Sequence, residues 1–313
     1  MQFRRLGPDG PEISVVGMGA WAIGGPWRFG WGPQDDDESL AALHKAFDAG
    51  VNWVDTAAVY GLGHSEEVVG QAVREHGGEV LVFTKCGRPW YGRENNEPTY
   101  DLRPDTIRFE LEQSLKRLGT DHVDLYQFHW PDTETGTPVE DSWATMADLV
   151  TEGKVRWAGL SNFDVQGLER CERVRHVDSL QPPFSLIDRS AAPEIAWCAA
   201  NRTGVLCYSP LGSGLLTGSF DADRVRDLPA GDWRRTSDEF RPPRLEANLE
   251  VVRRLEPVAE RHGVSVAAVA VAWVLTVEGV TAAIVGARRP SQVDGWLPAG
   301  DLRLTGADLA GLA

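Results

Sequence analysis

The chain has 313 residues, of which 42% are hydrophobic and 25% charged, a composition typical of a folded globular protein rather than a disordered one. Its formal net charge is −15 at pH 7, and an anionic surface repels nucleic acid phosphates and acidic lipid headgroups. Composition and charge therefore argue against a nucleic acid or membrane partner and favour a small-molecule ligand.

The four cysteines, Cys86, Cys171, Cys198 and Cys207, stand far apart, without a C-x-x-C motif or the spacing of metal ligands. Such unpaired thiols predict a reducing, cytoplasmic compartment and no metal site. The first ten residues lack the apolar region of a signal peptide. The apolar run 264–277 is too short to span a bilayer, so it predicts a buried helix.

The first expected element is a β-hairpin. Residues 2–6 and 12–15 flank the sequence Gly-Pro-Asp-Gly, which is a strong turn signal. We expect this hairpin to cover the bottom of a barrel formed by the strands that follow.

Eight short apolar runs predict strands, and helical patterns separate them. The strands are expected over 15–18, 52–55, 80–84, 123–128, 155–160, 179–181, 205–208 and 283–285. Helices are expected over 39–49, 65–75, 104–118, 139–152 and 164–174. This alternation has no linker within it, which favours an α/β fold consisting of a single (β/α)₈ barrel, or TIM barrel, over residues 1–313.

A doubly wound sheet is the alternative architecture. Its first strand–helix turn would carry G-x-G-x-x-G, whereas this chain has GMGAWAIGG there. Residues 212–244 are rich in Gly, Pro and Asp and show little periodicity, which predicts a long functional loop.

Four titratable residues fall at or just after the ends of adjacent predicted strands: Asp55, Tyr60, Lys85 and His129. In a barrel these strand ends share one rim, where chemistry takes place. Singly, each has an ordinary explanation as a helix cap, a rim residue or a packing side chain. Together they indicate a catalytic site.

The four side chains suit proton transfer to a carbonyl oxygen. A neighbouring ammonium lowers the pKa of a tyrosine from its usual ~10, and a carboxylate keeps that ammonium charged and oriented. A histidine beside them hydrogen-bonds a carbonyl oxygen or relays the proton. None of these side chains can supply hydride, so the reduction requires a cofactor.

Four segments, DTAAVYGLGHSEE, VFTK, DLYQFHWPD and GKVRWAGLSNF, resemble the aldo-keto reductase superfamily, most closely its bacterial branch of vegetative, sugar- or inositol-associated reductases. The resemblance extends from Leu6 to about Leu304. It implies a (β/α)₈ barrel that binds NADP(H) without a Rossmann domain. It also implies that Asp55, Tyr60, Lys85 and His129 are the catalytic tetrad, with Tyr60 as the general acid in reduction.

The resemblance also implies how the cofactor is held at its nicotinamide end and pyrophosphate. Ser161, Asn162 and Gln181 match the residues that bind the nicotinamide carboxamide, and Tyr208 matches the aromatic ring that stacks on the nicotinamide. The pyrophosphate loop is matched by Ser209, Leu211, Gly212, Ser213 and Gly214. Without the resemblance, an ordinary flexible loop is the better explanation of this Gly-Ser-Gly run. The long loop that follows would act as a strap over the cofactor.

At the adenosine end, the segment IVGARRPSQVDGW places Gly286, Arg288 and Gln292 at cofactor-binding positions. Arg288 is the candidate for the 2′-phosphate, because a guanidinium forms paired hydrogen bonds with phosphate oxygens. The chain departs from the family pattern at Gly295 and Trp296, where a Glu-Asn pair ordinarily binds adenine. We expect Trp296 to pack rather than to stack on the base.

Several of the twelve tryptophans fall on expected rim loops, and Trp21, Trp90 and Trp130 are the candidates for contact with substrate. The resulting prediction is an NADP(H)-dependent oxidoreductase of aldehydes or ketones, with sugar- or polyol-related compounds among the candidates. A lyase or isomerase using Lys85 as a Schiff-base amine is an alternative, although it leaves GLSNF, YSPLGSG and GARRPSQ unexplained. A regulatory subunit that senses nicotinamide nucleotides with little turnover is another.

Overall fold

The computed structural model describes residues 1–27, 30–229 and 232–312. Eight parallel strands close into a barrel in chain order, with the last strand paired to the first. The strands are β3 (Val16–Gly19), β4 (Trp53–Asp55), β5 (Leu81–Cys86), β6 (Val123–Phe128), β7 (Val155–Ser161), β8 (Ser179–Gln181), β9 (Gly204–Cys207) and β10 (Ala282–Gly286). The predicted (β/α)₈ barrel is therefore confirmed.

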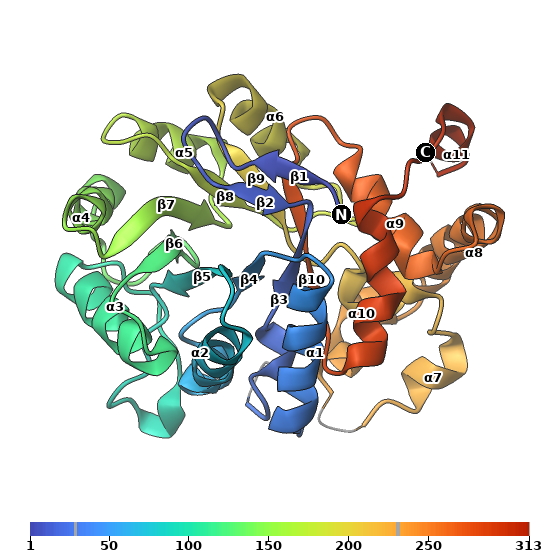
Figure 1. The fold of residues 1–313 in the computed structure, drawn as a ribbon, viewed down its shortest axis with the longest axis horizontal. Coiled ribbons are helices and arrows are strands. Elements are labelled where there is room, and N and C mark those ends of the chain that lie inside the picture. Colours follow the sequence, from blue (N-terminus) through green and yellow to red (C-terminus); the bar gives the residue numbers. More distant parts are fainter. Residues whose placement is uncertain (28–29, 230–231, 313) are drawn as a thin grey trace.

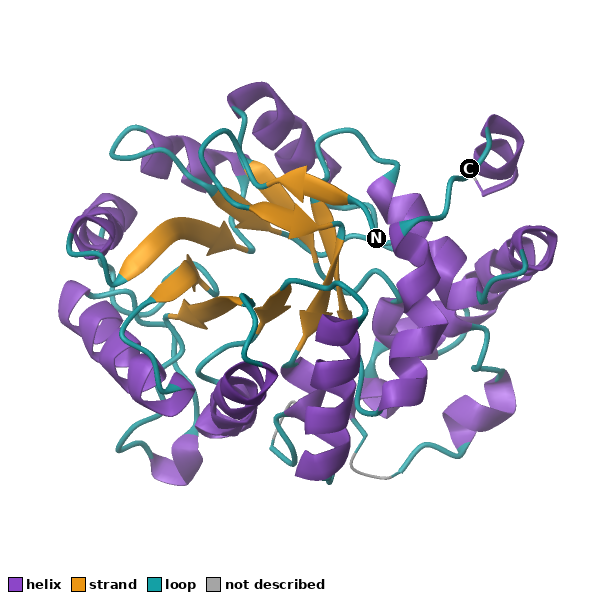
Figure 2. Cartoon of the chain, viewed as in Figure 1, coloured by secondary structure: helices purple, strands orange, loops and turns teal. Residues whose placement is uncertain are grey.

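Helices surround the barrel on its outside (Figures 1 and 2). Those packed around the strands are α1 (Asp36–Asp48), α2 (His64–His76), α3 (Pro104–Leu118), α4 (Val139–Thr151), α5 (Val165–Glu172), α6 (Ala192–Asn201), α8 (Arg244–His262), α9 (Val266–Leu275) and α10 (Pro290–Trp296). Local sequence explains their ends. The Asp35 side chain accepts the N–H groups of Asp37 and Glu38 at the start of α1. Gly119, with φ of 70°, ends α3.

Helix α9 is buried from Ala267 to its end at Leu275, as predicted for the apolar run around it. Within the described residues, no individual helix combines the length and apolar character needed to cross a bilayer. Helices α8 and α9 reach that length only as a pair bent by 97°.

The predicted N-terminal hairpin is present as β1 (Phe3–Arg5) and β2 (Glu12–Ser14), which pair antiparallel with Phe3 opposite Ser14. Leu6 and Ile13 pack against residues near the barrel interior, including Trp53. The Trp53 indole N–H donates to the Ser14 carbonyl at 2.9 Å. The hairpin therefore covers the end of the barrel where the strands begin.

The segment after β9 has little regular structure, as predicted. It contains the short helical turns η4 (Gly212–Thr217), α7 (Ala222–Arg226), η5 (Trp233–Thr236) and η6 (Asp238–Phe240). Residues 230–231 of this predicted loop lie outside the described residues. A small apolar cluster fixes the segment against the start of α8; its members are Leu215, Phe220, Leu228, Phe240 and Leu245. The short helix α11 (Gly306–Leu312) follows later, near the C-terminus.

Candidate active site

The structure brings the four predicted catalytic residues together at the carboxyl ends of β4, β5 and β6. The Lys85 ammonium donates to Asp55 Oδ1 at 2.6 Å and to the Thr56 carbonyl at 2.8 Å. The same nitrogen lies 3.4 Å from the Tyr60 hydroxyl. The rings of Tyr60 and His129 meet edge to face, with 5.5 Å between their centroids.

Local backbone geometry places Lys85 and Tyr60. Side chains alternate along β5, so Thr84 faces the surrounding helices while Lys85 faces the Asp55 carboxylate. Tyr60 begins a tight turn, η2 (Tyr60–Gly63), in which Gly61, Leu62 and Gly63 all have positive φ angles of 59°, 56° and 104°. Positive φ is unfavourable for leucine, so contacts elsewhere must hold this turn.

Burial is the largest influence on the pKa values of Tyr60, Lys85 and His129. It raises the pKa of Tyr60 well above its usual value, and the Asp55 carboxylate raises it further. This direction is opposite to the lowering predicted from the nearby ammonium, because desolvation of the phenolate outweighs the attraction of Lys85. Burial also lowers the pKa of Lys85, although the Asp55 carboxylate opposes that effect.

His129 is neutral at neutral pH. Burial lowers the pKa of its imidazole well below the usual value, and the positive charges of Lys85 and Arg88 lower it further. At neutral pH the rim therefore presents a protonated phenol, a neutral imidazole and an ammonium paired with one carboxylate. This set can donate a proton to a substrate oxygen and stabilise the anion left behind.

The residues expected to bind the nicotinamide carboxamide form a hydrogen-bonded group beside the tetrad. Asn162 donates to the His129 carbonyl at 2.9 Å and accepts from the Tyr208 hydroxyl at 2.8 Å. The Ser161 hydroxyl donates to the Gln181 carbonyl at 2.9 Å. The structure thus brings all four predicted residues together.

Gln181 also reaches the catalytic carboxylate, since its Nε2 donates to Asp55 Oδ2 at 2.8 Å. The buried Gln127 lies beside both groups, 3.4 Å from Asp55 Oδ2 through its Nε2 and 3.3 Å from the Gln181 Nε2 through its Oε1. Sequence reasoning did not single out Gln127. The available signal was a polar residue inside the apolar strand DLYQF.

The predicted pyrophosphate loop lies directly after β9. Leu211 has a φ of −99°, and Gly212, Ser213 and Gly214 follow with φ of 52°, 56° and 101°. The N–H groups of Gly212 and Gly214 donate within the loop, to the Ser209 and Leu211 carbonyls at 3.0 Å each. Ser209 also has a positive φ of 55°. These two bonds hold the predicted pyrophosphate loop in a compact turn directly after β9.

At the predicted adenosine end, Arg288 is held in place by residues from the loop before α1. Its Nε donates to Gln34 Oε1 at 2.6 Å and its Nη2 to the Pro33 carbonyl at 2.5 Å. Gln292 Oε1 accepts the Arg288 backbone N–H at 2.7 Å. Sequence reasoning missed Gln34, because its contact with Arg288 spans 254 positions along the chain.

The charge around Arg288 fits a phosphate group. Burial lowers the pKa of Arg288, and the guanidinium groups of Arg234 and Arg289 lower it further. The Asp232 carboxylate, which pairs with Arg234 at 2.6 Å, opposes this lowering of the Arg288 pKa. An anion beside Arg288 would relieve the repulsion among the arginines that remains. Arg234, from the long loop, was not predicted.

The remaining predicted positions at this end lie on β10 and α10. Gly286 is the exposed last residue of β10. The space beside Gly295 is open, since a Cβ built on this glycine would meet no atom within 4 Å. Trp296 is 2% exposed within the main core, so the prediction that it packs is confirmed.

The three tryptophans expected to contact substrate differ in their exposure and in their contacts with the tetrad. The Trp21 ring lies 6.5 Å from the Tyr60 ring and stacks on Trp233 at 6.0 Å. Trp90 is 6% exposed and belongs to an apolar cluster with Tyr60. Trp130, directly after His129, is 37% exposed. Trp233 belongs to the long loop and was not predicted from the sequence.

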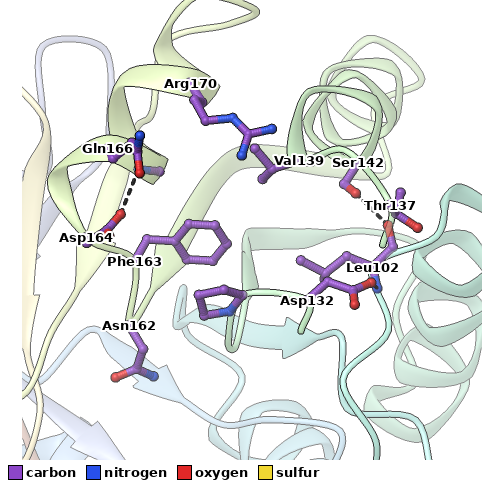
Figure 3. Close-up of a pocket in the computed structure, with 12 residues that line it drawn as sticks. Leu102, Asp132, Thr137, Val139, Ser142, Asn162, Phe163, Asp164, Gln166 and Arg170 are labelled. Carbon is purple, nitrogen blue, oxygen red and sulfur yellow. Dashed lines mark hydrogen bonds between the residues drawn. The ribbon is translucent and has the colours of Figure 1, made fainter. Parts of the chain in front are cut away.

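A separate cavity of about 280 Å³ lies beside this site, between α4 and α5 (Figure 3). Asn162 lines it, and the Phe163 ring lies between Asn162 and Arg170 in that view. Arg170 is paired with Glu140 at 2.5 Å. The cavity is thus a polar side pocket that shares Asn162 with the candidate active site.

Comparison with known proteins places this geometry in a family. Residues 15–313 match the Aldo/keto reductase family. Aldo-keto reductase YhdN of Bacillus subtilis is 36% identical over 298 residues, covering 94% of this chain and 87% of YhdN. The NADH-specific methylglyoxal reductase of Escherichia coli is 32% identical over 315 residues, covering 97% of this chain and 94% of that protein.

Among solved structures, the glycerol dehydrogenase AKR11B4 from Gluconobacter oxydans superposes with a TM-score of 0.89 at 38% identity. The match covers 99% of this chain and 93% of the dehydrogenase. The chain therefore belongs to the aldo/keto reductase family, as its sequence motifs predicted.

Proposed function

We propose that the protein is an NADP(H)-dependent oxidoreductase that reduces aldehydes or ketones to alcohols, with Tyr60 as the general acid. The observation that carries this proposal is the buried contact of the Lys85 ammonium with both Asp55 and Tyr60. The aldo/keto reductase family uses nicotinamide cofactors, and the polar group around Asn162 lies on the same rim.

In this proposal the cofactor is held along the rim by the residues described above. Ser161, Asn162 and Gln181 would bind the carboxamide, Tyr208 would stack on the ring, and the loop from Ser209 to Gly214 would bind the pyrophosphate. Gly286, Arg288 and Gln292 would hold the adenosine end, with Arg288 on the 2′-phosphate. When bound, the nicotinamide supplies hydride to the carbonyl carbon.

The protein side chains manage the proton. The raised pKa of Tyr60 keeps its phenol protonated, so the hydroxyl donates its proton to the carbonyl oxygen as negative charge develops there. The Lys85 ammonium stabilises the phenolate that remains, and Asp55 keeps that ammonium oriented. The neutral His129 imidazole hydrogen-bonds the substrate oxygen.

A small carbonyl compound or polyol is the proposed substrate class, bound against Trp21, Trp90 or Trp130. Two relatives support it by name, one a methylglyoxal reductase and the other a glycerol dehydrogenase. We also propose that residues 1–313 form one domain and that the protein is cytoplasmic. The four cysteines are free and buried, which accords with a reducing compartment.

The test is a cofactor-coupled screen of aldehydes, ketones, sugars and polyols in both directions, with NADPH and NADH compared. We expect turnover of small carbonyl compounds with a preference for NADPH. Tight cofactor binding without turnover of any substrate would favour the nucleotide-sensing alternative. Covalent trapping of Lys85 by borohydride in the presence of a carbonyl compound would favour the Schiff-base alternative.

A further inference from the structure

Arg117, in the last turn of α3, is a buried hub that the proposed chemistry does not use. Its side chain is 13% exposed. Its Nε donates to Glu66 Oε2 at 2.7 Å, its Nη1 to the Tyr91 hydroxyl at 2.7 Å and its Nη2 to the Ser114 hydroxyl at 3.3 Å. One guanidinium therefore connects α2, α3 and the loop after β5.

Glu66 connects this hub to the strand that carries the catalytic lysine. It is fully buried, and its second oxygen accepts the Thr84 hydroxyl at 2.5 Å. Thr84 directly precedes Lys85 on β5, so the two side chains leave the strand on opposite faces. The Glu66–Arg117 pair is thus hydrogen-bonded to the residue that directly precedes Lys85.

Arg117 also packs directly on the turn that carries Tyr60. A Cβ built on Gly63 would lie 2.6 Å from Arg117 Cδ, which shows that the aliphatic part of Arg117 lies against that glycine. The turn has three consecutive residues with positive φ, one of them Leu62. Such a strained conformation persists only where surrounding contacts impose it.

The same guanidinium also lies close to the stacked rings of Trp90 and Tyr91, which we call the Trp90 wall. It lies 5.7 Å from the Trp90 ring centroid, and Trp90 stacks on Tyr91 with 4.4 Å between centroids. Trp90 packs in one apolar cluster with the segment Ala57–Val59 and with Tyr60. Arg117 therefore contacts both the turn of the proposed acid and the aromatic side chain proposed to face substrate.

We propose that Arg117 is a positioning residue that fixes the Tyr60 turn and the Trp90 wall relative to Lys85. The inference rests on the proposed carbonyl reduction, in which the substrate oxygen must meet Tyr60 while the rest of the substrate contacts Trp90. Arg117 itself would contact no reacting atom in the proposed reaction. Its loss is expected to lower the fraction of time in which the Tyr60 hydroxyl and the Trp90 ring are both placed to meet substrate.

The main variant is the double substitution Glu66→Gln/Arg117→Met, because removing both partners avoids leaving a buried unpaired carboxylate. Tyr91→Phe is a milder variant that removes one hydrogen bond of the hub. Arg117→Lys keeps the charge but lacks the planar fork. The matched control is Arg108→Met on the same helix, where the arginine is 40% exposed and pairs with Glu152.

Two readouts separate positioning from general stability. Hydrogen exchange of segments 57–66 and 88–93 is expected to be at least tenfold faster in the double variant, without substrate present. The kcat/KM for carbonyl reduction is expected to fall about ten- to a hundredfold, while the Kd for NADPH changes less than threefold. Arg117→Lys is expected to fall between the wild type and the double variant, and Arg108→Met to match the wild type.

A folded double variant with normal exchange in both segments would overturn the positioning role, whether or not its activity falls. So would normal kcat/KM with faster exchange. If the wild-type protein itself reduces no carbonyl compound, the proposed function fails. The exchange of the two segments still reports whether Arg117 holds them.

Discussion

The Tyr60 hydroxyl acts on substrate rather than on cofactor in the proposed reaction, which makes its removal a sharp test. We expect Tyr60→Phe to lower carbonyl reduction by at least the ~10²–10⁴-fold that positioned proton transfer supplies. NADPH affinity, measured by fluorescence titration, should stay nearly unchanged. A variant that keeps a tenth or more of wild-type reduction would contradict the assignment, and His129 would become the leading candidate for the acid.

Lys85 is the cation that offsets the burial of the Tyr60 phenolate. Burial and Asp55 both raise the pKa of Tyr60, so Lys85→Met, which removes the ammonium 3.4 Å away, should raise that pKa further. Alcohol oxidation needs the phenolate as base, so its pH profile should move to higher pH. The measurement is kcat/KM for oxidation against pH, with Lys154→Met as control, since Lys154 pairs with Glu112 on the surface. An unmoved profile would refute this role.

Arg288 carries the proposed preference for NADP(H). A charge-assisted bond to a phosphate contributes ~1.5–3 kcal/mol, roughly ten- to a hundredfold in affinity. Arg288→Ala should therefore weaken NADPH binding by that factor and NADH binding much less. Titration of both cofactors checks this, and equal losses for both would show that Arg288 does not read the 2′-phosphate. One relative is NADH-specific by name, so the comparison of the two cofactors discriminates between the two preferences.

The sequence was informative where chemistry-bearing residues share short motifs at strand ends. Asp55, Lys85 and His129 were placed correctly on one rim because parallel strands end together in a barrel. The direction of the Tyr60 pKa was predicted wrongly, since the depth of burial depends on side chains far away in the chain. Gln127 and Gln34 were missed for a similar reason, because their partners lie on other elements.

At the scale of elements, prediction succeeded best for segments with strong local signals. The bounds of α3 and β6 were predicted as they occur, at 104–118 and 123–128. A first-turn proline and a terminal glycine mark the ends of the helix, and a mainly apolar run marks the strand. Strand β9 ends at Cys207, one residue before the predicted end, and Tyr208 forms only an isolated bridge to Pro183.

The long segment after β9 was recognised only as a loop. Its short helical turns are held by contacts with distant residues rather than by a periodic pattern of its own. Trp233 is the main example, since it stacks on Trp21 and meets Trp31 edge-on at 5.8 Å. No local sequence pattern near position 233 predicts aromatic contacts with residues about 200 positions earlier in the chain.

This aromatic contact joins the loop after β9 to the loop after β3. Each aromatic pair contributes ~0.5–1.5 kcal/mol, so losing both pairs corresponds to roughly five- to a hundredfold. We expect Trp233→Ala to increase the dissociation rate of NADPH by a factor in that range, because the segment is then free to leave the cofactor. Stopped-flow release measures it. Trp157→Ala, at the hairpin end of the barrel, should leave the rate unchanged; equal effects of both variants would contradict the prediction.

For the whole molecule, Glu110 makes stability depend on pH. It is fully buried on α3, and burial raises its pKa to about 8 from 4.5. Its Oε2 accepts the Gly87 N–H at 2.7 Å. Between these two values the folded state holds a proton that the unfolded state has released, so the free energy of unfolding falls as pH rises, by at most ~1.4 kcal/mol per pH unit.

Glu110→Gln should therefore flatten the loss of stability between pH 5 and pH 8 and stabilise the protein at pH 8 relative to the wild type. Urea denaturation at several pH values measures the effect. Glu112→Gln, two positions along the same helix and on the surface, is the control and should keep the wild-type slope. A Glu110→Gln variant with that same slope would show that Glu110 is ionised in the folded protein.

The N-terminal hairpin bears on how Tyr60 regains its proton between turnovers in the proposed reaction. Leu6, Ile13 and Trp53 are each at most 1% exposed there, so apolar side chains fill that end of the barrel. In the proposed reaction, we therefore expect the protons that replace the one donated by Tyr60 to arrive from the side where substrate binds. We then expect re-protonation of Tyr60 to follow the departure of the alcohol, so that faster product release hastens it.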